Sequence, residues 1–241
     1  MVPDPAWPGR RNAYSARLKD PGAQMTARIF QDNDQTTRWW WVRHAPVTAN
    51  QGRIYGQNDM PADTDDPEIF AALARALPAN AVLVTSRLRR THQTAQAIAA
   101  AGLELAEPIV IADLNEQNFG DWQGRHYADI QKELDTDHPF WLMPAKHCAP
   151  GGESFCQVVD RVADAIARLT QAHAGRDIIA VAHGGTIRAA LSVALDLDPD
   201  TALGFNLYNC SITRIDYVPP SRHYPDGSWA IVHTNGLAHG H

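Results

Sequence analysis

The sequence predicts an α/β fold, a three-layer α/β/α sandwich with a mostly parallel central sheet. Short apolar runs typical of buried strands alternate along the chain with longer segments of helical periodicity. The run at 177–182 (DIIAVA) is almost continuously apolar, which is typical of a parallel strand covered on both faces. The chain has 241 residues, 44% of them hydrophobic, and can bury such a sheet without disulfide bonds.

Six strands are predicted from apolar runs bounded by Gly, Pro or polar residues, at 39–42, 81–85, 108–111, 177–182, 211–218 and 229–234. Helical spacing predicts four helices, at 67–77, from Ser86 to Gly102, from Glu153 onward, and from Thr186 to about Leu195. Asp66 followed by Pro67 is the expected start of the first helix, and Ser86 is the expected cap of the second. The third has an apolar face made of Phe155, Val159, Val162, Ile166 and Leu169.

The first 37 residues differ from the rest, because they hold four prolines and no sustained period. We expect residues 1–37 to be a flexible extension and residues 38–241 to be the folded domain. The net charge of −6 disfavours a nucleic-acid partner, and no apolar run is long enough to span a bilayer. Three cysteines without metal-ligand spacing and the lack of a secretory signal predict a reduced, cytoplasmic protein.

Polar side chains follow four of the predicted strands at the point where each strand ends. They are Arg43 and His44 after 39–42, Ser86, Arg87, Arg89, Arg90 and His92 after 81–85, Asp113, Asn115 and Glu116 after 108–111, and His183 after 177–182. Because ligands of open α/β sheets bind beyond the carboxyl ends of the strands, we expect these side chains to meet at one edge.

Such a set suits phosphate-ester chemistry. A neutral imidazole is a nucleophile toward phosphorus, and arginines bind phosphate oxygens in a fork. Gly184 lies at the predicted helix start after His183, where backbone N–H groups attract an anion. A carboxylic acid such as Glu116 can protonate a leaving oxygen and later activate water.

These residues lie in motifs that resemble the histidine phosphatase superfamily, the phosphoglycerate-mutase-like fold. Arg43-His44 is similar to its RHG motif, and 86–95 (SRLRRTHQTA) is similar to its SPLxRAxQTA segment. Three further segments follow in the family's order, at 114–124 (LNEQNFGDWQG), 150–154 (PGGES) and 182–188 (AHGGTIR). Five motifs in order are specific, and they extend from about Trp40 to Leu195.

The resemblance implies roles for individual residues. His44 would be the nucleophile that becomes phosphohistidine, and Glu116 the general acid that then activates water. Arg43 and Arg90 would bind the phosphate, and His183 would stabilise the transferring group. Asn50 and Arg53 lie near the family's loop Asn and its GR pair, with spacing one residue short, and the alternative is a turn Asn and a loop Arg.

The sequence departs from the family pattern at two places. Ala45 stands where the family has Gly, and Pro46 follows it. We expect the extra methyl group to be tolerated if φ of Ala45 is negative. Arg87 replaces the usual Pro, and it either adds positive potential at the rim of the site or points into solvent.

Other residues have simpler interpretations. We expect His92 to lie on a helix surface, and the tryptophans at 39–41 to pack in the core. His138, His147 and Cys148 match no common zinc spacing, so no metal site is predicted. The segment 140–143 (FWLM) either forms an apolar lid over the site or packs locally, and the sequence leaves both open.

The predicted function is metal-independent hydrolysis of a small phosphorylated metabolite through a phosphohistidine, without a cofactor. A neutral His44 and a protonated Glu116 together predict a bell-shaped dependence of rate on pH. The alternatives are a phosphoglycerate mutase, which the compact segment 123–149 disfavours, and a non-catalytic phospho-ligand-binding protein. Arg-His-Ala-Pro, with Tyr55-Gly56 and Asp59, is also similar to some α-ribazole-phosphate phosphatase-like sequences. The oligomeric state is left open.

Overall fold

A computed structural model describes residues 35–134, 138–139, 141–222 and 225–237. Most of the predicted extension, residues 1–34, lies outside the described residues, so its flexibility stays a prediction. The first strand begins at Thr37, two residues earlier than predicted, and Thr36 and Thr37 are buried. Thr37 therefore belongs to the sheet and not to the extension.

The fold is built on a six-stranded sheet with strand order β3-β2-β4-β1-β5-β6. The strands are β1 (Thr37–Arg43), β2 (Val82–Thr85), β3 (Ile109–Val110), β4 (Asp177–Ala182), β5 (Ser211–Val218) and β6 (Ser228–Leu237). Strands β3, β2, β4 and β1 are parallel, whereas β5 is antiparallel to both of its neighbours. The predicted mostly parallel sheet is confirmed.

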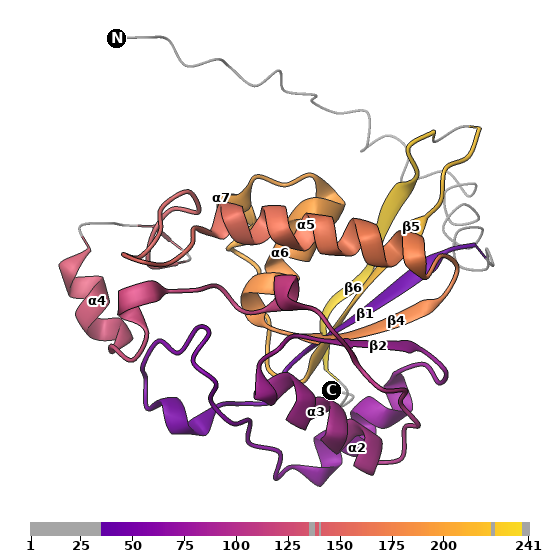
Figure 1. Cartoon of the computed structure of the whole chain (residues 1–241), viewed down its shortest axis with the longest axis horizontal. Coiled ribbons are helices and arrows are strands. Elements are labelled where there is room, and N and C mark those ends of the chain that lie inside the picture. Colours follow the sequence, from indigo (N-terminus) through magenta and orange to yellow (C-terminus); the bar gives the residue numbers. More distant parts are fainter. Residues whose placement is uncertain (1–34, 135–137, 140, 223–224, 238–241) are drawn as a thin grey trace, which may run out of the picture.

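Helices cover both faces of this sheet and give the predicted three layers (Figure 1). One face carries α5 (Phe155–Ala172), α6 (Gly184–Leu195) and the short α7 (Pro199–Ala202), and the other carries α2 (Pro67–Ala76) and α3 (Arg89–Ala100). Helix α4 (Tyr127–Glu133) lies apart at one end, and single-turn 3-10 helices occur at Thr48–Asn50, Ala112–Leu114 and Gly120–Trp122. No helix in the described part of the chain is long and apolar enough to cross a membrane.

The starts of α2 and α5 follow local capping signals, whereas the start of α3 does not. Asp66 caps α2 by accepting from the Ile69 amide, as predicted. Ser154 and Gln157 form a capping box at the start of α5. The prediction for Ser86 was wrong, because α3 begins at Arg89 and its N-cap, Leu88, has no side chain that can cap.

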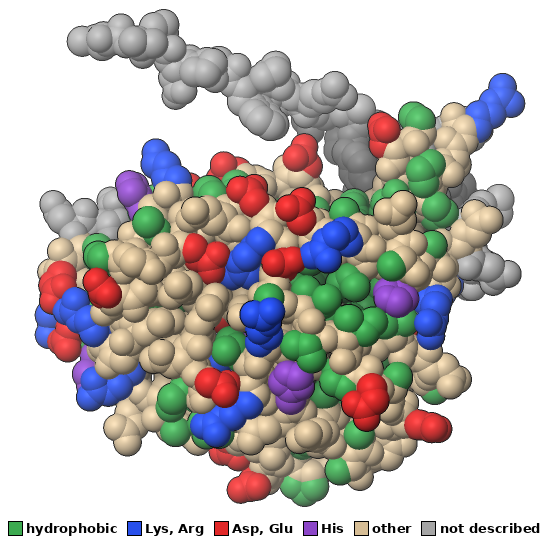
Figure 2. Space-filling view, in the orientation of Figure 1, with side chains coloured by type: hydrophobic (Ala, Val, Ile, Leu, Met, Phe, Trp, Pro, Cys, Tyr) green, Lys and Arg blue, Asp and Glu red, His purple; other side chains and the backbone are tan. Residues whose placement is uncertain are grey.

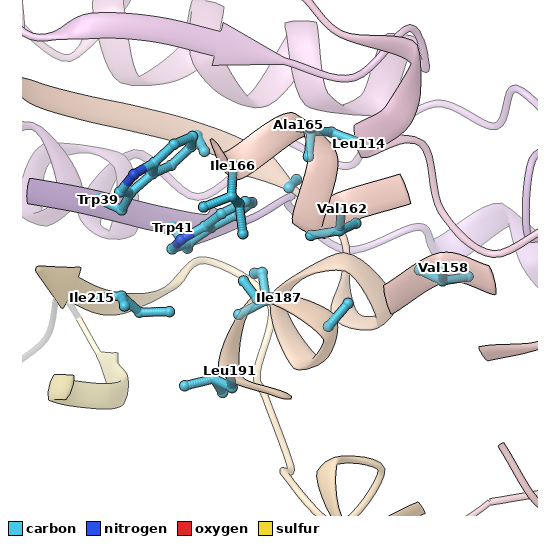
Figure 3. Close-up of a cluster of buried hydrophobic side chains, with 14 of the residues drawn as sticks. Trp39, Trp41, Leu114, Val158, Val162, Ala165, Ile166, Ile187, Leu191 and Ile215 are labelled. Carbon is cyan, nitrogen blue, oxygen red and sulfur yellow. The ribbon is translucent and has the colours of Figure 1, made fainter. Parts of the chain in front are cut away.

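Side chains of the central strands alternate between two hydrophobic cores. Trp39 and Trp41 point toward α5 and α6, where Ile166 and Ile187 contact the same cluster (Figure 3). The next residue, Val42, belongs to the second cluster, which α2 and α3 cover. This period of two is the geometry of a strand buried on both faces, and it confirms core packing for the tryptophans.

The register of the sheet brings the carboxyl ends of its central strands together. Arg43 pairs with Ala182, and Thr85 pairs with Val181. The residues that follow β1, β2 and β4 therefore lie side by side at one edge, which is the place predicted for the site.

Candidate active site

His44 and His183 lie against each other at this edge. His44 follows β1 and His183 follows β4, and their ring centroids are 5.1 Å apart at an angle of 61°. The His44 amide donates to the Ala182 carbonyl oxygen at 2.9 Å, so the ladder between β1 and β4 continues into the site. Both side chains are almost fully buried.

The surroundings of His44 set its tautomer and its charge. Its Nδ1 lies 2.6 Å from the Ala45 carbonyl oxygen, which can only accept, so Nδ1 carries the proton and Nε2 keeps its lone pair. Burial and the nearby Arg90 guanidinium hold the pKa of His44 well below 6.5. The ring is therefore neutral at pH 7 with Nε2 free to act as a nucleophile.

His183 takes the opposite tautomer. Arg90 Nε donates to its Nδ1 at 3.2 Å, so the proton lies on Nε2, which donates to Ser86 Oγ at 2.8 Å. Burial and Arg90 also hold the pKa of His183 well below 6.5. Ser86, expected as a helix cap, instead fixes the orientation of this imidazole.

The two arginines of the site are held differently. Arg90 is fully buried and donates to the carbonyl oxygens of Gly56 at 2.6 Å and Asn58 at 3.0 Å. Arg43 donates through Nη1 to the Leu207 carbonyl oxygen. Its Nε is buried and has no hydrogen-bond partner among the described residues. An unpaired buried donor is costly, so Arg43 Nε is prepared to receive an anionic oxygen.

Glu116 reaches the same edge from the loop after β3. Its Oε1 accepts from the Gln117 amide at 2.9 Å and from the Gly185 amide at 3.2 Å. Gly185 is in the first turn of α6, so the carboxyl group lies at the positive end of that helix.

The loop that carries Glu116 is clamped from α5 by Arg161, which the sequence did not single out. Its terminal nitrogens donate to the carbonyl oxygens of Asp113 at 2.5 Å, Asn115 at 2.8 Å and Glu116 at 3.2 Å. The same guanidinium pairs with both carboxylate oxygens of Glu153, at 2.9 and 2.8 Å. Glu153 in turn accepts from the Asn118 amide at 2.8 Å. The motif at 150–154 thus holds the Glu116 loop in place.

A cavity of about 140 Å³ opens above these groups. Of the predicted residues, Arg43, Glu116 and Gly184 line it, whereas the more deeply buried His44, Arg90 and His183 do not. Tyr55 also lines the cavity, 6.5 Å from the His44 ring and 5.0 Å from the Arg90 guanidinium.

Two further side chains of the lining, Tyr127 and Arg188, were not predicted as site residues. Burial, with Tyr55 and Glu116 close by, raises the pKa of Tyr127 to about 12. The Tyr127 hydroxyl group therefore stays protonated at neutral pH. Arg188 follows the HGG motif by one helical turn, and this position in a helix that starts at the site is the signal that could have found it.

Asn50 and Arg53 lie elsewhere. Asn50 Nδ2 donates to the Arg53 carbonyl oxygen at 3.2 Å, and Arg53 Nη1 donates to the Gly124 carbonyl oxygen at 2.8 Å. Neither residue lines the cavity. Their predicted role in phosphate binding stays a prediction that these contacts do not support.

The departures from the family pattern fit the backbone. Ala45 is not among the described residues with positive φ, and its amide donates to Thr94 Oγ1 at 2.9 Å. The Pro46 carbonyl oxygen accepts from the Asp63 amide at 2.7 Å. Arg87 is exposed, and its amide donates to Asn115 Oδ1 at 2.9 Å.

The segment 140–143 has one residue at the cavity and others in a local cluster, and a lid over the site stays a prediction. Trp141 lines the cavity, whereas Met143 is buried in a separate local cluster. Phe140 lies outside the described residues. His92 is half-buried on α3 and does not line the cavity. Within the described ranges, no three His, Cys, Asp or Glu side chains are grouped as metal ligands.

This geometry agrees with a comparison against protein-family models. Residues 39–232 match the model of the histidine phosphatase superfamily, branch 1. The chain belongs to the histidine phosphatase superfamily. The resemblance inferred from the five motifs is therefore confirmed, and so is the prediction of a phosphatase.

Known members of the superfamily resemble the chain over most of its length. It is 30% identical over 204 residues to a metal-independent phosphoserine phosphatase of Arabidopsis thaliana, covering 82% of this chain and 81% of that protein. It is 27% identical to the adenosylcobalamin/α-ribazole phosphatase of Escherichia coli, covering 74% of this chain and 89% of that protein. The solved structure of a mycobacterial glucosyl-3-phosphoglycerate phosphatase superposes with a TM-score of 0.70 at 26% identity, covering 83% of this chain and 99% of that one.

Proposed function

We propose that this chain is a phosphomonoesterase that hydrolyses its substrate through a phosphohistidine on His44, without a metal ion. One observation carries the proposal. A buried neutral imidazole with a free Nε2 lies beside two guanidinium groups and a carboxyl group at a helix N-terminus. Nucleophile, phosphate-binding cations and acid are the parts that phosphoryl transfer needs.

In the first step, the His44 Nε2 lone pair attacks phosphorus while the ester P–O bond breaks. Glu116 supplies the proton that the leaving oxygen needs. Arg43 Nε and the Arg90 guanidinium neutralise charge on the phosphoryl oxygens. Tyr55, which lines the cavity 6.5 Å from the His44 ring, lies beside the reacting group. The Nδ1–H bond to Ala45 holds the ring in place throughout.

In the second step, the ionised Glu116 takes a proton from water, and the water oxygen attacks phosphorus. The P–N bond breaks, inorganic phosphate leaves, and neutral His44 and protonated Glu116 are restored. His183, oriented by Ser86 and Arg90, supports the transferring group beside the nucleophile.

The substrate class is a small phosphorylated metabolite, as for the phosphatase relatives. Phosphoserine, α-ribazole phosphate and glucosyl-3-phosphoglycerate are therefore the first compounds to screen. We also propose a cytoplasmic location, which the three unpaired cysteines support. Nucleic acid is not an expected partner, because the net charge is −6, and on the face seen in Figure 2 acidic and basic side chains are intermixed.

The test is hydrolysis of p-nitrophenyl phosphate with EDTA present, for the wild type and for His44→Ala. We expect the wild type to be active and the variant to lose activity by about 10³-fold or more, because the nucleophile is gone. His92→Ala, on α3 outside the cavity, is the matched control and should keep the wild-type rate.

Other results point to the alternatives. Loss of activity in EDTA would contradict metal independence. Wild-type conversion of 3-phosphoglycerate to its 2-isomer without phosphate release would indicate a mutase. Phosphate binding without turnover of any ester would indicate a phospho-ligand-binding protein.

A further inference from the structure

Arg188 presents a second cationic group to the same cavity. It lies one turn after Gly184 on α6, and helical side chains lean back toward the N-terminus of their helix. Its Nη1 is 3.5 Å from the position that a Cβ atom on Gly184 would occupy, and Arg43 Nε is 3.6 Å from that position. The two guanidinium groups therefore face one small space beside Gly184.

Only the Nε atom of the Arg188 guanidinium group has a hydrogen-bond acceptor among the described residues. Its Nε donates to the Phe205 carbonyl oxygen at 2.7 Å, and its guanidinium lies 5.6 Å from the Trp141 ring. Its terminal nitrogens have no hydrogen-bond acceptor among the described residues. Arg188 is half-buried, and this burial lowers the pKa of its guanidinium group. The fork of the guanidinium is thus held in position and left without an anion.

The charges around the cavity leave Arg188 unmatched. A phosphate monoester carries at most two negative charges, which Arg43 and Arg90 neutralise. Glu116 is the only carboxyl group that lines the cavity among the described residues, and it must be protonated to act as an acid.

We propose that Arg188 binds a carboxylate that the substrate carries close to its phosphate ester. The substrate class is then the phosphomonoesters of hydroxy acids and hydroxy amino acids. The inference rests on the proposed function and narrows it. A carboxylate fits better than a second phosphate, because a single fork supplies one positive charge and two parallel donors.

The test compares esters that differ at the carboxylate. O-phosphoserine is paired with O-phosphoethanolamine, and 3-phosphoglycerate with glycerol 3-phosphate. In Arg188→Met we expect kcat/KM for the carboxylate-bearing ester to fall about 10- to 100-fold, mainly through KM, and that of its partner to change less than about threefold. Arg188→Lys should recover part of the loss, since it keeps the charge without the fork.

Arg75 is exposed on α2, and Arg75→Met is the control for the loss of one positive charge. This variant should leave kcat/KM unchanged for both esters of each pair. Equal losses for both esters of each pair, or no loss, would overturn the inference while leaving the phosphatase intact. If the wild type hydrolyses no ester, the proposed function fails. Calorimetry then measures the Kd of O-phosphoserine and of O-phosphoethanolamine for the wild type and for Arg188→Met. A weaker binding of O-phosphoserine alone in the variant would support the role of Arg188, and equal binding would contradict it.

Discussion

Two adjacent glycines at the start of α6 serve different groups of the site. A Cβ atom on Gly184 would make ordinary contacts with the guanidinium groups of Arg188 and Arg43, at 3.5 and 3.6 Å. A Cβ atom on Gly185 would lie 2.3 Å from Glu116 Oε1, which is far too close. One glycine therefore keeps space for the anion, and the other lets the acid reach the helix N-terminus.

The two alanine variants should separate binding from proton transfer. Gly184→Ala places a methyl group where phosphate would contact Arg43, so we expect KM to rise about 3- to 30-fold with kcat less affected. Gly185→Ala displaces the flexible Glu116 side chain, so kcat should fall about 100-fold. Kinetics with p-nitrophenyl phosphate measure both, with thermal unfolding as the control for folding. The same change in kcat and KM for both variants would contradict this division.

The neighbours of the two histidines, and not the histidines themselves, decide which nitrogen carries the proton. A carbonyl oxygen faces Nδ1 of His44, whereas a guanidinium N–H faces Nδ1 of His183. Identical side chains 5.1 Å apart therefore have opposite tautomers. Only His44 has its free lone pair on Nε2, which is why it and not His183 is the proposed nucleophile.

At the scale of elements, α5 acts as the support of the acid. It packs against the tryptophans of β1 through its apolar face (Figure 3) and carries Arg161. Arg161 and Glu153 then hold the loop at 113–118 by backbone contacts. The acid is thus placed by a helix that carries no catalytic residue itself.

Removing this clamp should lower turnover without weakening phosphate binding. In Arg161→Met we expect kcat to fall about 10- to 100-fold, because a displacement of the general acid Glu116 by about 1 Å slows the chemical step by that order. We also expect a loss of about 1–2 kcal/mol in the free energy of unfolding, since the half-buried carbonyl oxygens of Asp113, Asn115 and Glu116 lose their donor. For Arg161→Lys we expect a kcat between that of Arg161→Met and that of the wild type. The inhibition constant of inorganic phosphate should stay unchanged.

Arg168 is the matched control, two turns further along α5. It pairs with the side chain of Asp113 on the same loop, but both side chains are largely exposed. Exposed pairs contribute little, so Arg168→Met should change kcat less than about twofold. A comparable effect of both variants would show that Arg161 acts through general charge and not as a clamp.

At the scale of the whole molecule, the fold buries two neutral histidines at the end of its central strands. Their pKa values are well below 6.5 in the folded state and close to about 6.5 in the unfolded chain. Below about pH 6.5 the unfolded state therefore binds more protons than the folded state, and acidification favours unfolding.

We expect the free energy of unfolding to fall between about pH 6.5 and 5 by as much as about 1.4 kcal/mol per pH unit for each of the two histidines. Urea denaturation at a series of pH values measures this slope. His44→Asn and His183→Asn should each lower this slope by the contribution of one histidine, up to about 1.4 kcal/mol per pH unit. A wild-type slope that neither substitution changes would mean that other groups control acid stability.

The elements were predictable because their signals are local. Strand 211–218 and strand 177–182 have the predicted bounds, since runs of apolar residues between turns need no tertiary information. The same holds for the Asp66 cap of α2. Ser86 was misassigned because its hydroxyl has two possible uses, and the tertiary fold supplies an imidazole and the Leu88 amide as its partners.

The sequence by itself determined the fold class, the superfamily and the set of side chains that follow the strands. These depend on periodicity and motif order, which are properties of neighbouring residues. Only the tertiary structure decided the tautomers, the clamp by Arg161, the place of Arg188 beside Arg43, and the positions of Asn50 and Arg53 outside the cavity. The physical reason is that hydrogen bonds and charge pairing join groups far apart in the chain, and packing of the helices on the sheet sets which groups meet.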